Sequence, residues 1–386
     1  MKKKTTASFG LAALAACALA VGLVAPSSAD QQPRSTDAVG VGSDTVQYVS
    51  DFVDDGDASA HAGYNATNTA RRVWSFDATT DGSGRAVYGP GGVAISPSIV
   101  LRAGTKPQTR PNGSGAGITA LLNDGTHQID FVRSSRLPSA TEQASAVGAA
   151  SFGGQGIHVY QIATDGMLIA TNVSGSHVPA GGLSCATLVQ IYKGAYKKWT
   201  DIPGNSAGSS DGIVPVIPQS GSGTAKDFLA SLATCNGGVA ITLGSNVKTG
   251  EEHDPASITS SPTSPDVNGN TVTSADTISP FSTGRNNLIN SGYFGGTPAP
   301  NTITLLPGGA ATTDSSTSYT YARTLYILCR DVDVTSATPF QVGGLNNLVN
   351  TLFGTSTSWY AKASNSALFT SAGVTQSWAD LGVINS

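Results

Sequence analysis

Residues 218–224 are small and rich in hydroxyl groups, which is the composition of an anion-binding loop. They join the apolar, β-branched segment 212–217, which predicts a strand, to Phe228, Leu229 and Leu232 at helical spacing. The first N–H groups of a helix have no partner inside the helix and lie at the positive end of its dipole. Glycines let an anion approach these groups and hydroxyls add donors, so the segment predicts an oxyanion cradle. A plain helix cap with a flexible lead-in fits the same residues equally well.

Three further segments repeat this order of a strand followed by small polar residues. Residues 42–45 and 113–117 each stand between a predicted strand and an amphipathic helix, and residues 133–135 follow a strand predicted at 128–132. Ligands of α/β sheets collect at the carboxyl ends of strands. Four such strand ends in one chain favour one shared oxyanion site over coincidental capping.

The elements that must position these segments alternate between strand and helix. Further strands are predicted at 157–162, 166–170 and 326–334, and helices at 185–193 and 343–353. This alternation predicts an α/β fold with mainly parallel or mixed sheets. The chain of 386 residues is too long for one ordinary core and suits two lobes.

The beginning of the chain predicts a secretory signal peptide at residues 1–29. A basic start precedes an apolar run at 9–24 and small residues up to Ala29. A lipoprotein box ending at Cys17 would instead attach the chain to lipid, but residues 18–25 stay apolar, so we favour free secretion. No second apolar run of about 18 residues follows. The protein is therefore expected outside the cytoplasm, secreted or at the cell surface.

The charge pattern argues against a nucleic-acid partner. Only 12% of the residues are charged, the formal net charge is −4, and no basic cluster is present. We expect a monomer without a cofactor.

The cysteines predict one disulfide. An extracellular destination permits Cys185 and Cys235 to pair, and the loop they close would be stabilised by about 4 kcal/mol in the chain-entropy model. Cys329 lies in the apolar run 325–329 and is expected as a buried thiol. No Cys/His spacing is typical of zinc, so no metal is predicted.

One sequence pattern is typical of a hydrolase. Residues 204–208 match the Gly-x-Ser-x-Gly nucleophile elbow, which needs a strand before it and a helix after it, whereas loop is predicted on both sides. The five histidines show no triad order, and Lys226 is expected to point to solvent. The chain is therefore not expected to be an enzyme.

A cluster of titratable residues stands in a polar loop predicted at 248–276. His253 beside Glu251, Glu252 and Asp254 could indicate a metal site or an acid–base group. We favour a solvated acidic loop.

Taken together, the segments resemble the phosphate-binding proteins of bacterial ABC transporters, which have the periplasmic-binding-protein-like class II fold. The resemblance covers most of residues 38–385. It implies a two-lobe α/β fold of mixed sheets flanked by helices, with crossover strands joining lobes that close over an anion. Lobe I would comprise residues 38–155 plus 322–386, and lobe II residues 156–321. The segments that carry the resemblance are 40–45, 113–117, 130–138, 183–201 and 221–224.

The resemblance also implies a set of ligand-binding residues. Asp44 and Thr45 would offer backbone N–H groups and Ser114 its hydroxyl, and the 222–224 segment would clamp the anion from the second lobe. The full predicted set is Ser43, Asp44, Thr45, Ser114, Gly115, Ser134, Ser135, Ser222, Gly223 and Thr224.

Two departures from the family pattern affect the ligand. The family usually has an aspartate at the position of Ser135, which accepts a hydrogen bond from protonated phosphate, and an arginine at the position of Pro218. Arg133 and Arg136 are candidates to replace the missing positive charge. Without the aspartate, poorer discrimination between phosphate and sulfate is predicted.

The expected function follows from these features. The chain is interpreted as a secreted solute-binding protein that captures a small oxyanion, inorganic phosphate by default, for a membrane ABC importer. The alternative is a secreted binding or surface module on the same fold whose anion site is altered or lost.

Overall fold

The computed structural model describes residues 32–79, 96–179, 181–206, 208–309, 318–335 and 346–386. The predicted signal peptide and Cys17 lie outside these residues. Across the described ranges, no helix has the length and apolar character needed to cross a membrane.

A mixed ten-stranded sheet runs through the molecule in the order β2-β1-β5-β11-β6-β9-β7-β8, with β10 and β12 also paired to β6. The predicted α/β class with mixed sheets is therefore confirmed. The strands are β1 Ala38–Gly42, β2 Val73–Ser75, β5 Phe131–Ser134, β6 Ile157–Asn172, β7 Val214–Pro218, β8 Lys248–Gly250, β9 Thr277–Ser282, β10 Ile303–Leu305, β11 Tyr321–Arg330 and β12 Thr375–Val383. A separate pair consists of β3 Ser98–Ile99 and β4 Gln108–Thr109.

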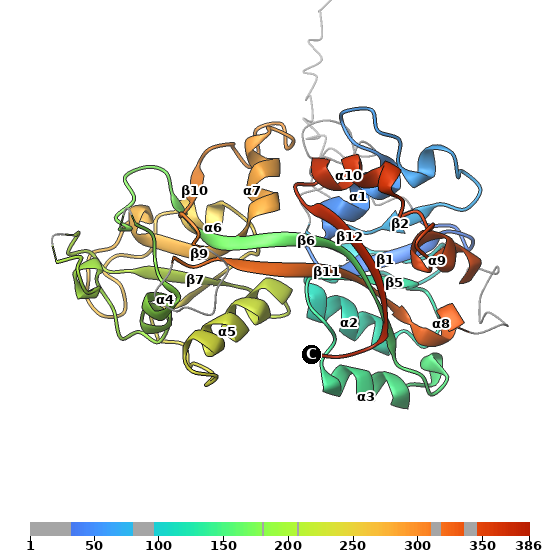
Figure 1. Ribbon diagram of the computed structural model, residues 1–386, viewed down its shortest axis with the longest axis horizontal. Helices are drawn as coiled ribbons and strands as arrows, with labels where there is room; N and C mark the ends of the chain where they lie inside the picture. Colours follow the sequence, from blue (N-terminus) through green and yellow to red (C-terminus); the bar gives the residue numbers. More distant parts are fainter. Residues whose placement is uncertain (1–31, 80–95, 180, 207, 310–317, 336–345) are drawn as a thin grey trace, which may run out of the picture.

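Helices cover the sheet in both halves of the molecule, which Figure 1 shows as two lobes. Side-chain hydroxyls begin several of them: Ser139, Ser184, Ser222 and Ser282 each accept a hydrogen bond from a backbone N–H three residues later. The helices are α1 Gln47–Asp55, α2 Ser114–Asn123, α3 Ala140–Gly148, α4 Cys185–Tyr192, α5 Gly223–Cys235, α6 Ala256–Thr259, α7 Thr283–Asn290, α8 Asp331–Thr335, α9 Asn346–Phe353 and α10 Ser366–Ser371.

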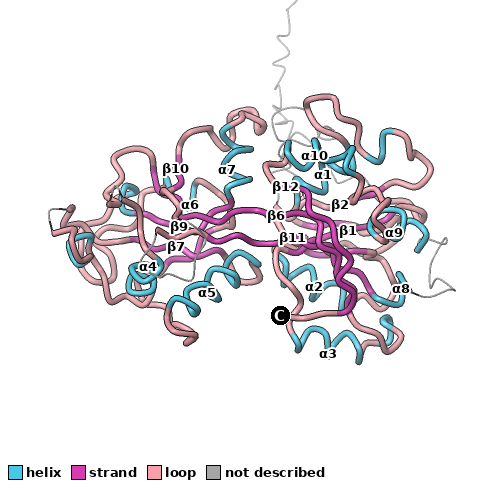
Figure 2. Tube along the Cα trace, viewed as in Figure 1, coloured by secondary structure: helices cyan, strands magenta, loops and turns pink. Residues whose placement is uncertain are grey.

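Two long antiparallel strands, β6 and β11, connect the lobes, and Figure 2 shows both running through the two halves. The two strands predicted at 157–162 and 166–170 are one strand of 16 residues, β6. Its first part pairs with β11 and β12, and its last part pairs with β9 of the other lobe. We propose the start of β6 and the start of β11 as the lobe boundaries, close to the predicted residues 156 and 322.

Each lobe has its own apolar cluster. In lobe I, Val39 and Val132 pack with Ile118 beneath α2, and in lobe II, Leu188 and Phe228 pack against Trp199. These clusters hold the starts of α2 and α5 against their strands. The helix ends that could contact a ligand are therefore packed against the sheet.

The carboxyl-terminal part differs from the sequence prediction. The strand predicted to end at 334 ends at Arg330, and α8 follows, because the chain turns away from the sheet after its pairing with Ile157. The predicted helix 343–353 is α9 within the described range, but α10 and β12 follow it. His158 on β6 contacts Asp331 and Asp380 at 2.7 Å each and so links β12 to the connecting strand.

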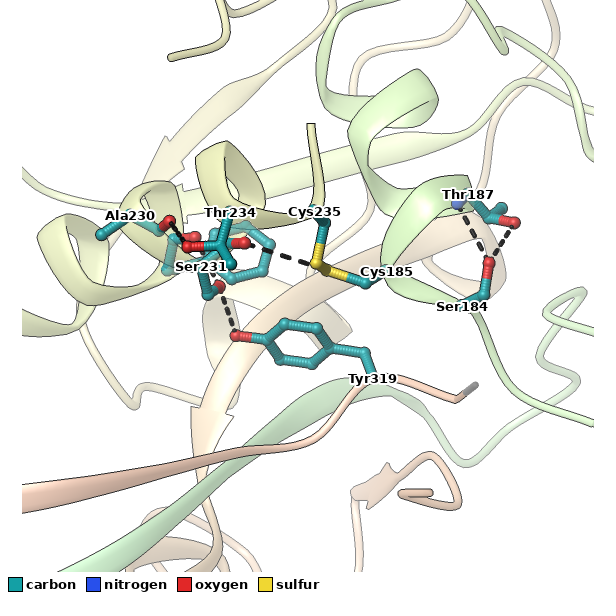
Figure 3. Close-up of a disulfide and its surroundings, with 9 residues drawn as sticks. Ser184, Cys185, Thr187, Ala230, Ser231, Thr234, Cys235 and Tyr319 are labelled. Atoms are coloured by element: carbon teal, nitrogen blue, oxygen red, sulfur yellow. Dashed lines mark hydrogen bonds between the residues drawn. A yellow bond between two sulfur atoms is a disulfide. The ribbon is translucent and has the colours of Figure 1, made fainter. Parts of the chain in front are cut away.

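The two cysteines predicted to pair lie at the start of α4 and the end of α5 (Figure 3). The sulfur atoms of Cys185 and Cys235 are 1.94 Å apart, as in a disulfide. Beside them, the Ser231 and Tyr319 hydroxyls are 2.9 Å apart. Cys329 is a free, fully buried thiol. Peptide mapping without reduction tests the pairing, and a bridge from Cys329 to either partner would contradict it.

Candidate oxyanion site

Helices from both lobes begin at the interface between the lobes. The segment before α1 meets the first turn of α5 where the hydroxyl oxygens of Thr45 and Thr224 are 3.2 Å apart. Within the described residues, no hydrogen bond uses the backbone N–H groups of Thr45, Gly223 or Thr224. Such groups at helix starts carry partial positive charge and are suited to an anion.

Small residues form one side of this locus. The Ser135 backbone N–H donates to the Ser114 hydroxyl at 3.0 Å, and the two serine hydroxyls are 3.2 Å apart. Gly223 of the other lobe lies directly against them: a methyl group on its Cα would come within 2.1 Å of Ser135 Oγ and 2.4 Å of Ser114 Oγ. Only glycine fits this contact while the lobes are together.

Charged residues form the opposite side. Arg323 on β11 donates to the Thr224 hydroxyl and pairs with Asp165 on β6 at 2.7 Å. Glu252 accepts hydrogen bonds from the hydroxyls of Thr45, at 2.7 Å, and Thr224. None of the three charged residues belongs to the predicted set.

Glu252 and His253 correct the prediction of a solvated acidic loop. Their residues are only 2% and 3% exposed. The loop turns inward because His253 adopts a positive φ of 56° and its Nδ1 accepts the Ser282 backbone N–H at 3.3 Å. The acidic residues on both sides of His253 were a sequence signal for a functional site. The burial of His253, however, depends on Ser282 of a separate strand.

The protonation state of His253 follows from its partners. Burial and then the positive charges of Arg323 and Arg285 lower the pKa of His253 well below its usual range. The ring is therefore neutral. Its Nδ1 accepts from Ser282, whereas Nε2 lies 3.3 Å from Nη2 of Arg323, which can only donate, so the two contacts favour different tautomers. Nε2 also lies 3.1 Å from the Thr45 hydroxyl and 3.3 Å from the Thr224 hydroxyl. Both hydroxyls donate to Glu252.

Asp44 connects the lobes. Its carboxylate accepts from Arg285 of α7 at 2.9 Å, and the same guanidinium nitrogen donates to the Asp44 carbonyl at 3.0 Å. Arg285 also lies over the Tyr48 ring, 4.3 Å from the centroid. The Asp44 side chain therefore faces lobe II.

The remaining predicted residues differ in orientation. The Ser43 hydroxyl is buried without a partner among the described residues, and the Ser222 hydroxyl caps α5. The Ser134 hydroxyl donates to the carbonyl of Arg136 and so stays within its own turn. Gly115 is half-buried and donates its N–H to the Gly221 carbonyl at 3.0 Å.

The arginines expected to replace the missing charge have other roles. Arg133 is fully buried and donates to the carbonyls of Ser43 and Gly42, so it braces the loop before α1. Arg136 pairs with Glu142 at the start of α3 at 2.7 Å. The positive charge nearest the Thr224 hydroxyl comes from Arg323 instead.

One carboxyl near the site titrates near neutral pH. Burial raises the pKa of Asp227, in the first turns of α5, to about 7, although Arg323 partly opposes the shift. Lys226 is exposed, as predicted. The local charge can therefore change over the neutral range.

A separate cluster has the composition of a metal site. His177, Asp211 and Asp276 bring ligand atoms within 4.8 Å of one another. Asp276, however, already accepts hydrogen bonds from Trp199 Nε1 and the Thr273 backbone, so we interpret its role as structural. Ser206 of the Gly-x-Ser-x-Gly pattern lies in an exposed turn, which does not provide the strand and helix of a nucleophile elbow.

Comparison with known proteins identifies the family. A family model described as the PBP superfamily domain matches residues 99–338. This chain belongs to the PBP superfamily. No curated protein matches the chain by sequence.

Several solved structures are similar to this PBP superfamily member. A Clostridium perfringens protein, described as a phosphate ABC transporter substrate-binding protein with bound phosphate, has a TM-score of 0.50 and 14% identity, covering 88% of this chain and 99% of that one. A Vibrio cholerae ABC-type phosphate transport receptor has a TM-score of 0.48 and 15% identity, covering 88% and 100%. A human phosphate-binding apolipoprotein has a TM-score of 0.47 and 15% identity, covering 88% and 90%. The C. perfringens structure confirms the two-lobe fold that the resemblance implies.

Proposed function

We propose that this PBP superfamily protein is a secreted or cell-surface solute-binding protein that captures a small oxyanion between its lobes. The observation that carries the proposal is the meeting of Thr45 with Thr224 beside the buried guanidinium of Arg323, where the backbone N–H groups of Thr45, Gly223 and Thr224 have no partner among the described residues. Inorganic phosphate is the first candidate, because the C. perfringens structure of the same fold holds phosphate. Delivery to a membrane ABC permease and a monomeric state are part of the proposal.

Two residues take the place of the aspartate and arginine that the family usually has and this chain lacks. Arg323 supplies the positive charge in place of the arginine expected at Pro218. Glu252 supplies a carboxylate acceptor in place of the aspartate expected at Ser135. We therefore propose preference for a protonated phosphate over sulfate, instead of the poor discrimination predicted from Ser135 alone.

Binding requires an exchange of hydrogen bonds. The Thr45 and Thr224 hydroxyls donate to Glu252 in this structure. If the two hydroxyls donate to a bound anion instead, Glu252 Oε1 becomes free to accept a hydrogen bond from that anion. A fully ionised anion has no hydrogen to donate to Glu252, which is the physical basis for the preference.

The same network supports a second candidate function. Because Thr45, Thr224, Glu252 and Arg323 already bond to one another, the two hydroxyls and Glu252 Oε1 are satisfied without a ligand. This is the arrangement expected if the chain is a secreted binding or surface module whose anion site is lost.

Calorimetry of the protein without residues 1–29 separates the candidates. Phosphate and sulfate are titrated at pH 7.5, and Thr224→Val serves as the variant that removes a central hydroxyl. We expect phosphate to bind, sulfate to bind at least tenfold more weakly, and the variant to lose affinity. Absence of binding to any oxyanion by the unmutated protein would reject the transport role and leave the surface module.

A further inference from the structure

A cavity of about 830 Å³ lies between the lobes beside the candidate site. Its lining includes Asp44, Glu252 and His253, so it is continuous with the charged side of that site. Cavities of this volume hold organic ligands of moderate size. A four-oxygen anion in the cradle would leave most of the cavity unfilled.

The cavity lining is acidic. The carboxylates of Glu251, Glu252 and Asp254 line it together with the guanidinium of Arg110, and the charge of Asp44 is already matched by Arg285. Arg110 donates to the carbonyls of Asp77 and Ser96, and the acidic groups of the lining remain in excess. A negatively charged substituent would be repelled here, whereas a cation would be attracted.

One residue of the lining has a buried oxygen without a donor. Glu252 is 2% exposed, and its Oε2 is buried without a hydrogen-bond partner among the described residues. Its other oxygen accepts from Thr45 and Thr224. A buried acceptor without a partner is costly, so a ligand that donates to Oε2 would relieve that cost.

We infer that the solute is an organic oxyanion ester whose substituent carries a protonated amine. The inference rests on the proposed function: the anionic head would lie at the N–H groups of Thr45 and Gly223. The amine would enter the cavity and donate to Glu252, and so replace the proton that the head of a phosphate ester, mostly doubly ionised at pH 7.5, cannot return to Glu252. Head and substituent can belong to one small molecule because the cradle and the cavity meet at Glu252 and His253.

Calorimetry at pH 7.5 with three probes tests the inference. The probes are O-phosphoethanolamine, propyl phosphate, which has a substituent of similar length without a donor, and inorganic phosphate. We expect O-phosphoethanolamine to bind at least tenfold more tightly than propyl phosphate. Glu252→Gln should reduce that ratio to threefold or less, and Asp201→Asn, which removes an exposed carboxylate outside the cavity, should leave it unchanged.

A steric variant provides an independent readout. Ala256→Trp places a large side chain at an exposed position of the cavity lining and should weaken O-phosphoethanolamine tenfold while inorganic phosphate binds as before. If inorganic phosphate binds and O-phosphoethanolamine shows no advantage over propyl phosphate, the inference is wrong and the proposed function stands. If none of the three probes binds, both are wrong.

Discussion

The two sides of the candidate site are built in different ways. The small-residue side brings Ser114 and Ser135 of lobe I against Gly223 of lobe II, all from short segments at strand ends. The charged side assembles Arg323 from a connecting strand, Glu252 from a loop and Asp165 from the other connecting strand. The small residues allow close approach and donate, whereas the charged residues set which ion is acceptable. The shape of the candidate site and its selectivity for an ion thus come from different parts of the chain.

The largest effect is expected on the charged side. Arg323→Met leaves the buried Asp165 carboxylate without its ion-pair partner and should lower the free energy of unfolding by about 3–5 kcal/mol. Urea denaturation measures the change. Adding Asp165→Asn should restore part of the loss, because no uncompensated charge remains. A single variant that loses less than 1 kcal/mol would mean that Arg323 does not compensate Asp165.

The small-residue side is tested by removing one hydroxyl. If the proposed function is correct, Ser114→Ala should weaken oxyanion binding by about 1.5–3 kcal/mol, or roughly one to two powers of ten, because the hydroxyl would bond a charged ligand. Ser222→Ala should act similarly. Ser134→Ala is the matched control, since its hydroxyl bonds only within its own turn. Equal losses for Ser114→Ala and the control would remove Ser114 from the site.

The contact between the two lobes is tested at Gly223. A methyl group there clashes with Ser114 and Ser135, and the strain of about 1–3 kcal/mol is relieved when the lobes separate. Gly223→Ala should therefore weaken binding with little change in the free energy of unfolding. Gly125→Ala is the control, because nothing lies within 4 Å of its added methyl. Small-angle scattering should show a more open molecule for Gly223→Ala, and an unchanged scattering curve with unchanged affinity would contradict the close contact.

The smallest effect concerns the pH dependence of stability. Because the pKa of His253 is lowered in the folded state, the unfolded state binds more protons as pH falls below about 6.5. Its contribution to stability is complete above that pH and is lost as pH decreases, by at most about 1.4 kcal/mol per pH unit. Urea denaturation of His253→Gln between pH 7.5 and 5 should therefore show a shallower decline than the unmutated protein. An identical decline would mean that His253 is not buried and neutral.

The small-residue side could be predicted from the sequence because it depends on local order. A strand, a glycine or serine turn and a helix follow one another within a few residues, and Ser222 caps α5 as a serine in that place should. The convergence of Thr45 with Thr224 follows from strand ends meeting in an α/β sheet. The family resemblance supplied the order of the lobes.

The charged side could not be predicted in this way. Arg323 lies in a strand whose sequence gives no sign of a ligand, and its position depends on pairing with β6 across both lobes. Glu252 is buried only because His253 turns the loop toward Ser282. β12 was missed because its residues are mostly half-exposed and lack the alternating pattern of a strand.

The location of Arg323 on β11 also has a consequence for the order of events in capture. β11 connects the lobes, and if two bodies joined by a pair of strands swing apart, as the proposed function requires, atoms on those strands move least. The guanidinium would then present the same electrostatic target before and after closure, whereas the Thr45 and Thr224 hydroxyls would come together only at the end. Attraction of the solute and its enclosure are thus separate steps, the first assigned to the hinge and the second to the lobes.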